Sequence, residues 1–301
     1  MSLLVTGSIG IDTVEAPSGR AANVLGGSSV YFAYAASFFS PVRLVGVIGE
    51  DCPPDFLKPL QSNPRVDLGG LEVRKGAKTF RWHGRYHADA NQRDTVSVEL
   101  NVLAQRGPDI PPAFRDSRFV FLANTHPALQ LSLLEQLHNP QLVVADTMDL
   151  WINTERAALR TLLGRLDGLV LNDSEAKLLT GQPNVVAAGL EIMTLVRGFV
   201  VVKKGEHGSL LFADGKVCAL PSYPTFRVID PTGAGDSYAG AMMGYLAGVG
   251  RVDGDALRRA IAYGTVTASF SLEDFSLRRL LTADRQQIEA RMREFEELVR
   301  F

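Results

Sequence analysis

Short apolar runs recur along the chain, and most of them are followed by a segment whose hydrophobic positions have helical spacing. Runs bounded by turn residues, as expected for strands buried on both faces of a sheet, occupy residues 3–10, 42–48, 118–123, 142–146, 168–172 and 199–203. The segments that predict helices are 30–38, 129–137, 154–163 and 173–179. This alternation predicts an α/β fold with a mostly parallel central sheet and helices on both faces, in which ligands bind beyond the carboxyl ends of the strands.

Two stretches depart from that pattern. Around residues 11–23 and from 71 to 102, polar and apolar residues alternate at period two, as in the segment from Thr79 to Tyr86. Such alternation is typical of antiparallel strands with one exposed face. The sequence has no internal repeat, low-complexity tract or linker. We therefore expect the two stretches to form a small β-sheet lid inserted in a single domain that spans residues 1–301.

Composition narrows the class of protein. The chain has 301 residues, of which 46% are hydrophobic, so a large core is possible. Its 31 basic and 33 acidic residues argue against nucleic acid or an anionic membrane as the main partner. Cys52 and Cys218 lack a metal-type spacing and suit ordinary thiols in a reducing compartment. There is no signal-peptide pattern and no apolar run of bilayer length, so we expect a cytoplasmic protein.

The most informative segment runs from Asp230 to Asp236 and reads DPTGAGD, between an apolar strand and a helix of small residues. The turn Gly233-Ala234-Gly235 can gather backbone N–H groups at the positive end of that helix, which suits a phosphate whose charge grows during transfer. Asp236 is placed to take a proton from an attacking hydroxyl. An ordinary turn with a capping Asp is the alternative, but it leaves two glycines and a second carboxylate unexplained.

This segment resembles the signature of the PfkB (ribokinase-like) carbohydrate kinases, a family that also includes adenosine and other nucleoside kinases. The resemblance extends over essentially the whole chain and implies a ribokinase-like fold. It implies that Asp236 is the catalytic base, that Gly233, Ala234 and Gly235 form the anion hole, and that Thr232 lies beside the donor nucleotide. Pro231 departs from the Thr or Ser that is usual in the family.

The segment Asn172-Asp173-Ser174-Glu175 closes one strand and begins a helix. By itself it is an N-cap followed by an acidic residue near a helix start. Beside the glycine turn, it resembles the family's Asn-x-x-Glu motif, which implies that Glu175 organises Mg²⁺ through water, with Asn172 in support. Since Mg²⁺ keeps several waters and needs few carboxylates, one Glu is chemically sufficient.

The segment Lys203-Lys204-Gly205-Glu206-His207-Gly208 follows another strand. It fits a hairpin whose glycines permit positive φ. It also resembles the family's nucleotide-binding stretch, Thr-x-Gly-x-x-Gly, which implies that Gly205 and Gly208 belong to the ATP site. Lys203 occupies the place of the usual Thr, so a positive side chain would stand near the phosphates.

Asp12 follows the first strand, where a lone Asp is more often a turn residue. The resemblance implies that Asp12 accepts hydrogen bonds from acceptor hydroxyls, and that Gly26 and Gly27 let the acceptor approach the backbone. Asn23 could add a polar contact. Many sugar kinases of the family have an Asn shortly after the paired glycines, whereas residues 28–31 here read SSVY. The acceptor contacts therefore differ from those of ribokinase.

Aromatic residues gather on the predicted lid, at Phe80, Trp82 and Tyr86, together with His83. They could pack the lid or join two lids in a dimer, or a ring could stack on a base or sugar face of the acceptor. The period-two pattern alone does not assign all three rings to one face. His83 and His87 have no spacing partner for a transition metal.

These features predict an ATP-dependent kinase that transfers the γ-phosphoryl group to a hydroxyl of a sugar or sugar-containing small molecule. A nucleoside kinase of the same fold is the nearest alternative, and a non-catalytic sugar- or nucleotide-binding regulator is a further one. We expect ATP and Mg²⁺ to be required, and the sequence leaves open a monovalent cation such as K⁺. We also expect a homodimer joined through the lid, with no nucleic-acid or membrane partner.

Overall fold

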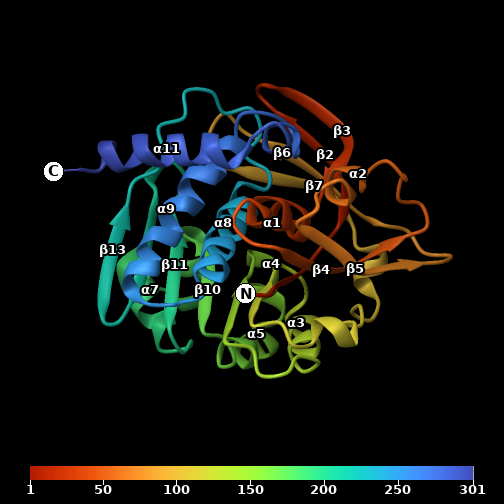
Figure 1. The fold of residues 1–301 in the computed structure, drawn as a ribbon, viewed down its shortest axis with the longest axis horizontal. Helices are drawn as coiled ribbons and strands as arrows, with labels where there is room; N and C mark the ends of the chain where they lie inside the picture. The colour runs from red at the N-terminus through yellow and green to blue at the C-terminus, as the bar shows by residue number, and fades with distance from the viewer. Residues whose placement is uncertain (301) are drawn as a thin grey trace.

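Nine strands form the larger of two sheets in a computed structural model that describes residues 1–300 (Figure 1). Their order is β13-β12-β11-β10-β9-β8-β1-β4-β5, with neighbours parallel from β11 to β5 and antiparallel in β11-β12-β13. The strands are β1 (Leu3–Thr6), β4 (Val42–Gly49), β5 (Val66–Arg74), β8 (Phe119–Leu122), β9 (Leu142–Asp146), β10 (Gly168–Asn172), β11 (Phe199–Lys203), β12 (Ser209–Ala213) and β13 (Lys216–Leu220). The parallel, doubly covered sheet predicted from the apolar runs is confirmed.

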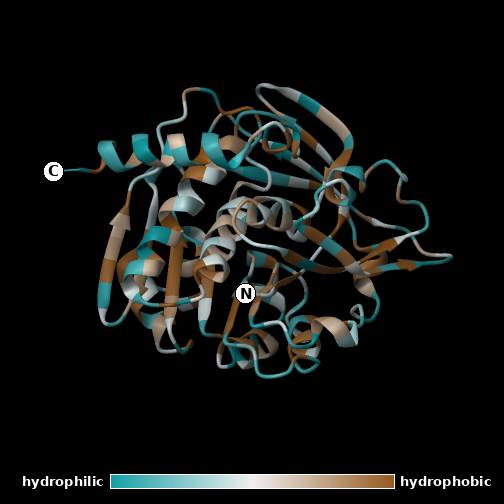
Figure 2. Ribbon diagram, in the orientation of Figure 1, coloured by the Kyte–Doolittle hydropathy of each residue, from teal (hydrophilic) through white to brown (hydrophobic). Residues whose placement is uncertain are grey.

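Helices cover both faces of this sheet and enclose two hydrophobic cores. One face carries α1 (Ser28–Ser37), α2 (Lys58–Gln61), α8 (Ala234–Val249), α9 (Gly254–Ser271), α10 (Arg278–Leu281) and α11 (Arg285–Leu298). The other carries α3 (Pro127–Leu134), α4 (Asp149–Thr154), α5 (Arg156–Leu163), α6 (Asp173–Thr180) and α7 (Val185–Met193). Hydrophobic residues concentrate along the strands between these layers (Figure 2).

Glycines bring α8 very close to α1. A Cβ atom on Gly244 would lie 2.7 Å from the carbonyl oxygen of Ala36, and a Cβ on Gly240 would collide with the carbonyl oxygen of Phe32. Helices whose contact residues are small can approach until their backbones touch. Helix α1 begins just after Gly27 and α8 just after Gly233. The contact between the two helices therefore fixes the positions of their first turns relative to each other.

Four strands form the smaller sheet, in the order β3-β2-β6-β7. They are β2 (Gly10–Ala16), β3 (Gly19–Gly26), β6 (Phe80–Tyr86) and β7 (Arg93–Glu99), and hydrophobic and hydrophilic residues are mixed along β2 and β3 (Figure 2). The boundary predicted at residue 71 was too early, because residues 71–74 end β5 and pair with β4 in the larger sheet. As an edge strand with one exposed side, β5 has the same period-two alternation as the lid strands.

Three short 3₁₀ helices lie in connecting segments: η1 (Asn101–Ala104), η2 (Pro112–Phe114) and η3 (Gly205–His207). Within residues 1–300, no helix combines the length and the apolar character needed to cross a bilayer.

Candidate active site

Three polar residues lie at the carboxyl ends of neighbouring parallel strands in the larger sheet. Asp146 ends β9, Asn172 ends β10 and Lys203 ends β11, with Asn172 and Lys203 in register. The first turn of α8, with Asp236, faces the same place, because the charges of Asp236 and Lys203 both affect the pKa of Asp146. Open α/β sheets bind their ligands beyond these carboxyl ends of the strands.

The turn before α8 has the conformation that its glycines allow. Gly233 has φ 75°, in the left-handed region, and the ring of Tyr31 packs directly beneath its Cα atom. A side chain at this position would meet both the strained backbone and the buried ring. Helix α8 then begins at Ala234, which leaves Asp236 in its first turn.

Asp230 stabilises this turn through hydrogen bonds to the backbone. It is fully buried, and its two carboxylate oxygens accept hydrogen bonds from the backbone N–H of Thr232 at 2.8 Å and of Ser276 at 3.2 Å. The Thr232 hydroxyl donates to the Tyr86 hydroxyl of the lid at 3.3 Å. Asp230 is therefore a structural carboxylate, while Thr232 connects the turn with the lid.

Asp236 and Asp146 are close enough for their charges to interact, and both carboxyl groups are poorly solvated. Burial raises the pKa of the Asp236 carboxyl, and the positive charges of Lys203 and Arg93 oppose that rise. Burial, followed by the charge of Asp236, raises the pKa of Asp146 well above its usual range. The Oδ1 atom of Asp146 is buried and has no hydrogen-bond partner within residues 1–300. An unpartnered buried oxygen is costly unless a ligand satisfies it.

Asp146 was not predicted from the sequence to be a site residue. Its place at the end of a buried strand, like those of Asn172 and Lys203, was the available signal. Arg93, at the start of β7, was also missed. Its guanidinium lies 5.7 Å from the centre of the Trp82 ring, and its charge lowers the pKa of Glu175 and Asp236 against the effect of burial. No spacing rule marks Arg93, because only the pairing of β6 with β7 brings it to the site.

Asn172 and Glu175 form a reciprocal capping box at the start of α6. The backbone N–H of Asn172 donates to Glu175 Oε2 and the backbone N–H of Glu175 donates to Asn172 Oδ1, both at 2.8 Å. The pKa of Glu175 is raised by burial and lowered by the charge of Lys203. The capping role considered from sequence is therefore present, and it engages only one oxygen of the half-buried Glu175 carboxylate.

The turn after β11 has positive φ at both of its glycines, 55° at Gly205 and 79° at Gly208. It connects two antiparallel strands and is closed by a 2.7 Å hydrogen bond from Lys204 N–H to the Gly208 carbonyl. Asn91, in the turn between β6 and β7, lies directly against Gly205. The lid therefore reaches the turn that the resemblance assigns to the nucleotide.

Asp12 lies on β2 in contact with Gly26, at which a Cβ atom would collide with its carboxylate. Burial raises the pKa of Asp12 to about 7, and the charges of Asp230 and Asp236 add to this rise. The backbone N–H of Gly27 donates a hydrogen bond to Asp12, whereas Asp12 Oδ1 is buried without a partner within the described part of the chain. This oxygen is free to accept a hydrogen bond from a ligand.

The structure does not bring Asn23 into this group. Asn23 is exposed at a bulge, with φ 51°, and Val24 is the residue that pairs with Asp12. The bulge and the left-handed backbone of Asn23 interrupt the alternation of side chains along β3, and Asn23 is left exposed.

Register decides the orientation of the lid aromatics. Phe80 pairs with Gly10 and Trp82 pairs with Asp12, so both rings lie on the Asp12 face of the lid. Tyr86 lies on the same face and is buried against Thr232. The opposite face is charged: Glu15 pairs with Arg85 at 2.7 Å and with His83 at 3.1 Å. The three rings therefore line the inner face, and the ion pairs occupy the outer one.

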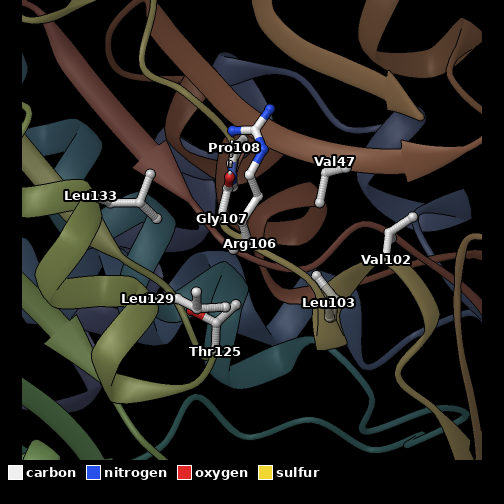
Figure 3. A pocket seen from close by; sticks show the side chains of 10 residues that line it. Val47, Val102, Leu103, Arg106, Gly107, Pro108, Thr125, Leu129 and Leu133 are labelled. Carbon is white, nitrogen blue, oxygen red and sulfur yellow. Dashed lines mark hydrogen bonds between the residues drawn. The ribbon is translucent and has the colours of Figure 1, made fainter.

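A small cavity lies between β4, η1 and α3, and none of the site residues described above lines it (Figure 3). It measures about 20 Å³ and is lined mainly by apolar side chains such as Val47, Leu103 and Leu129, with the unpartnered hydroxyl of Thr125 at its edge. This volume suits about one water molecule and is too small for an acceptor.

The raised pKa of Asp12 predicts that the stability of the protein depends on pH. The folded protein keeps a proton on Asp12 up to about pH 7, whereas the unfolded chain releases it near 3.8. The folded state thus binds more protons over this range, so the free energy of unfolding falls as pH rises through it, by ~1.4 kcal/mol for each pKa unit. We expect Asp12→Asn to raise Tm at pH 8 and to change it less at pH 5. The exposed Asp67→Asn is the control, and an equal change for Asp12→Asn at both pH values would contradict the prediction.

Comparison with known proteins agrees with this arrangement. The family model described as "pfkB family carbohydrate kinase" matches residues 12–283. A cytidine kinase of Thermococcus kodakarensis is 31% identical over 257 residues, which cover 83% of this chain and 89% of that protein.

Two solved structures show the same fold. A nucleoside kinase of Burkholderia thailandensis in complex with inosine has a TM-score of 0.78 at 19% identity, with 97% of this chain and 98% of that chain covered. A putative ribokinase II from E. coli, in complex with ATP and Mg²⁺, has a TM-score of 0.78 at 17% identity, with 97% and 99% covered. The ribokinase-like fold and the phosphotransferase activity predicted from the sequence are confirmed. The chain belongs to the pfkB family of carbohydrate kinases, in which sugars or nucleosides are phosphorylated on a hydroxyl group.

Proposed function

We propose that this kinase phosphorylates a nucleoside, with ATP as donor and a ribose hydroxyl as acceptor. The observation that carries the proposal is the inner face of the lid, where the free oxygen of Asp12 lies beside the rings of Phe80 and Trp82. The carboxylate suits a ribose hydroxyl, and the rings suit the flat face of a base. Similarity to a cytidine kinase supports the same acceptor class.

The reaction follows from the residues around the anion-hole turn. The acceptor oxygen bonds to the γ-phosphorus of ATP, and the bond from that phosphorus to the β–γ bridging oxygen breaks. ADP leaves with the electron pair, and the hydroxyl proton passes to Asp236. The backbone N–H groups of residues 233–235 stabilise the charge on the transferring group, while Thr232, Gly205 and Gly208 position the donor. Positioning and electrostatic stabilisation supply most of the acceleration in this chemistry.

The donor set fits Mg²⁺ held largely through water. Glu175 keeps one carboxylate oxygen outside its capping box, and Asp146 has an unpartnered oxygen nearby. Within residues 1–300, no three His, Cys, Asp or Glu side chains converge on a single point, which suits an ion that keeps its waters. Mg²⁺ would neutralise charge on the donor phosphates when bound, and Glu175 and Asp146 would orient its waters.

An acceptor without a base is the main competing possibility. A free sugar would use Asp12 but would leave most of the aromatic face of the lid unoccupied. A non-catalytic regulator would require neither the buried Asp236 nor the carboxylates of Asp146 and Glu175, all of which carry a desolvation cost.

An ATP-consumption screen over nucleosides, pentoses, hexoses and their phosphates tests the acceptor class. We expect turnover with a nucleoside, and Asp236→Asn should lower kcat by about 10²–10⁴-fold with ATP affinity almost unchanged, because Asn cannot accept the proton. Asp173→Asn, near the site but outside the proposed machinery, is the control. Turnover with free sugars alone would refute the nucleoside proposal, and an Asp236→Asn variant with more than about a tenth of the wild-type kcat would refute the base.

A magnesium titration tests Glu175. Glu175→Gln keeps the shape of the capping box but removes a negative charge, so we expect the Mg²⁺ concentration at half-maximal rate to rise with little change in acceptor KM. Identical midpoints in both proteins would leave Glu175 with its capping role alone. Repeating the assay in sodium and potassium buffers checks the monovalent-cation requirement that the sequence left open.

We also propose that two copies associate through the lid. Strand β7 is an unpaired edge of the small sheet and exposes Val96 and Val98, and such an edge readily pairs with another chain. Phe80 and Trp82 face inward and are not part of this surface. Light scattering at micromolar concentration should give roughly twice the 32.7 kDa chain mass. Val96→Glu should restore the single-chain mass, whereas Val186→Glu on α7 should not. A wild-type mass near that of one chain would refute the dimer.

A further inference from the structure

The ammonium group of Lys203 lies directly over Gly235. A Cβ atom at Gly235 would be 2.7 Å from Lys203 Nζ and 3.8 Å from Lys203 Cε, and it would meet no other atom within 4 Å. Lys203 is half-buried at the end of β11, and Gly235 lies in the first turn of α8. The missing side chain at residue 235 therefore leaves a space that the Lys203 ammonium occupies.

Lys203 is surrounded by carboxylates without pairing with one. Its charge opposes the rise in pKa that burial causes at Asp236, Glu175 and Asp146. Within residues 1–300, however, the lysine ion pairs within 4.0 Å are those of Lys58 and Lys177. The Lys203 ammonium thus stays near three acidic groups while its N–H donors remain available to an anionic ligand.

We propose that Lys203 is a catalytic residue that contacts oxygens of the phosphoryl group in transit, and that residue 235 is glycine partly to make room for its ammonium. This inference rests on the proposed kinase reaction and adds to it a side-chain cation on the β11 side of the anion-hole turn. As the γ-phosphorus passes from the bridging oxygen of ATP to the acceptor oxygen, Lys203 keeps its protons. It donates hydrogen bonds to the peripheral phosphoryl oxygens, while the acceptor proton goes to Asp236.

The geometry explains why a cation suits this place. Asp146, Glu175 and Asp236 would repel a triphosphate, and the ammonium offsets that repulsion where the phosphate must approach Gly235. A lysine ammonium provides a full positive charge there, whereas the hydroxyl of a threonine would provide only a dipole. The same charge keeps Asp236 closer to its ionised state, which a proton acceptor requires.

A double-mutant cycle tests the pair. We expect Lys203→Met to lower kcat by about 10²–10³-fold with acceptor KM almost unchanged, as for loss of one donor to a developing charge. Gly235→Ala should lower kcat to a similar extent, because the new methyl group displaces the ammonium. The double variant should be no slower than Lys203→Met, because the space above Gly235 has no further function once the ammonium is gone.

Two controls separate this effect from damage to the fold. Gly235→Ala should keep or raise Tm, because its only close neighbour is the end of a flexible side chain and alanine favours helix. Lys204→Met, next in the chain, removes one positive charge outside the proposed machinery and should keep kcat within about threefold of wild type.

Calorimetry with ATP and AMP gives a readout that does not depend on turnover. Lys203→Met should weaken ATP binding about tenfold or more and AMP binding much less, whereas Lys204→Met should weaken neither. A Lys203→Met variant with more than about a third of the wild-type kcat, or with unchanged ATP affinity, would overturn the catalytic role. If Gly235→Ala lowers kcat equally with and without Lys203, Gly235 does not serve to make room for the ammonium. The glycine would then be explained by the access of the phosphoryl group to the backbone. If no acceptor supports turnover, the proposed function fails, while the calorimetric comparison still decides whether Lys203 binds the phosphates.

Discussion

The backbone contact between α1 and α8 is the constraint on which the site depends. Gly240 and Gly244 let α8 approach the carbonyl oxygens of α1, and any larger residue at either position would push the helices apart. Gly27 immediately precedes α1 and Gly233 immediately precedes α8, so one packing interface sets the distance between these two glycines, which we propose lie beside the acceptor and the transferring phosphoryl group. Tyr31, in the first part of α1, supports Gly233 from below and makes the same connection through a side chain. Phosphoryl transfer requires reacting groups to be held within a fraction of an ångström, and a rigid helix pair meets that requirement better than loops do.

The carboxyl groups whose burial costs most free energy are gathered at the proposed active site. Asp12, Asp146 and Asp236 all have raised pKa values because burial removes water from their carboxyl groups, and two of these groups keep an oxygen without a partner. In a part of the protein with no ligand to bind, such groups would be replaced or paired, since each lowers the stability of the fold. Lys203 and Arg93 bring positive charge from the sheet and from the lid, which partly compensates the carboxylates, as the proposed binding of a charged donor requires.

The two faces of the lid carry different kinds of side chain, because successive residues of a strand point to opposite faces. Residues that face the large sheet carry the aromatic rings and Asp12, while the other face carries the ion pairs of Glu15 with His83 and Arg85. Exposed pairs of this kind contribute little stability, but they keep the outer face polar. The lid also contacts the two turns that we propose bind the donor, through Tyr86 at Thr232 and through Asn91 at Gly205. One small sheet therefore touches both of the proposed substrate positions.

Local sequence determined the parts of this protein that depend on neighbouring residues. Apolar runs predicted the buried parallel strands and period-two alternation predicted the lid. The segment 230–236 predicted a glycine turn that begins a helix with Asp236 in its first turn, because backbone geometry and helix capping are set by a few consecutive residues. Tertiary structure alone decided which distant groups meet. The register of β2 with β6 turned Phe80 and Trp82 toward Asp12, and the bulge between β2 and β3 left Asn23 outside. The pairing of β6 with β7 brought in Arg93, and the parallel order of β9, β10 and β11 placed Asp146 near Lys203. A strand shifted by one residue exposes the opposite side chains while its own alternation is unchanged, so no pattern within a single strand contains that information.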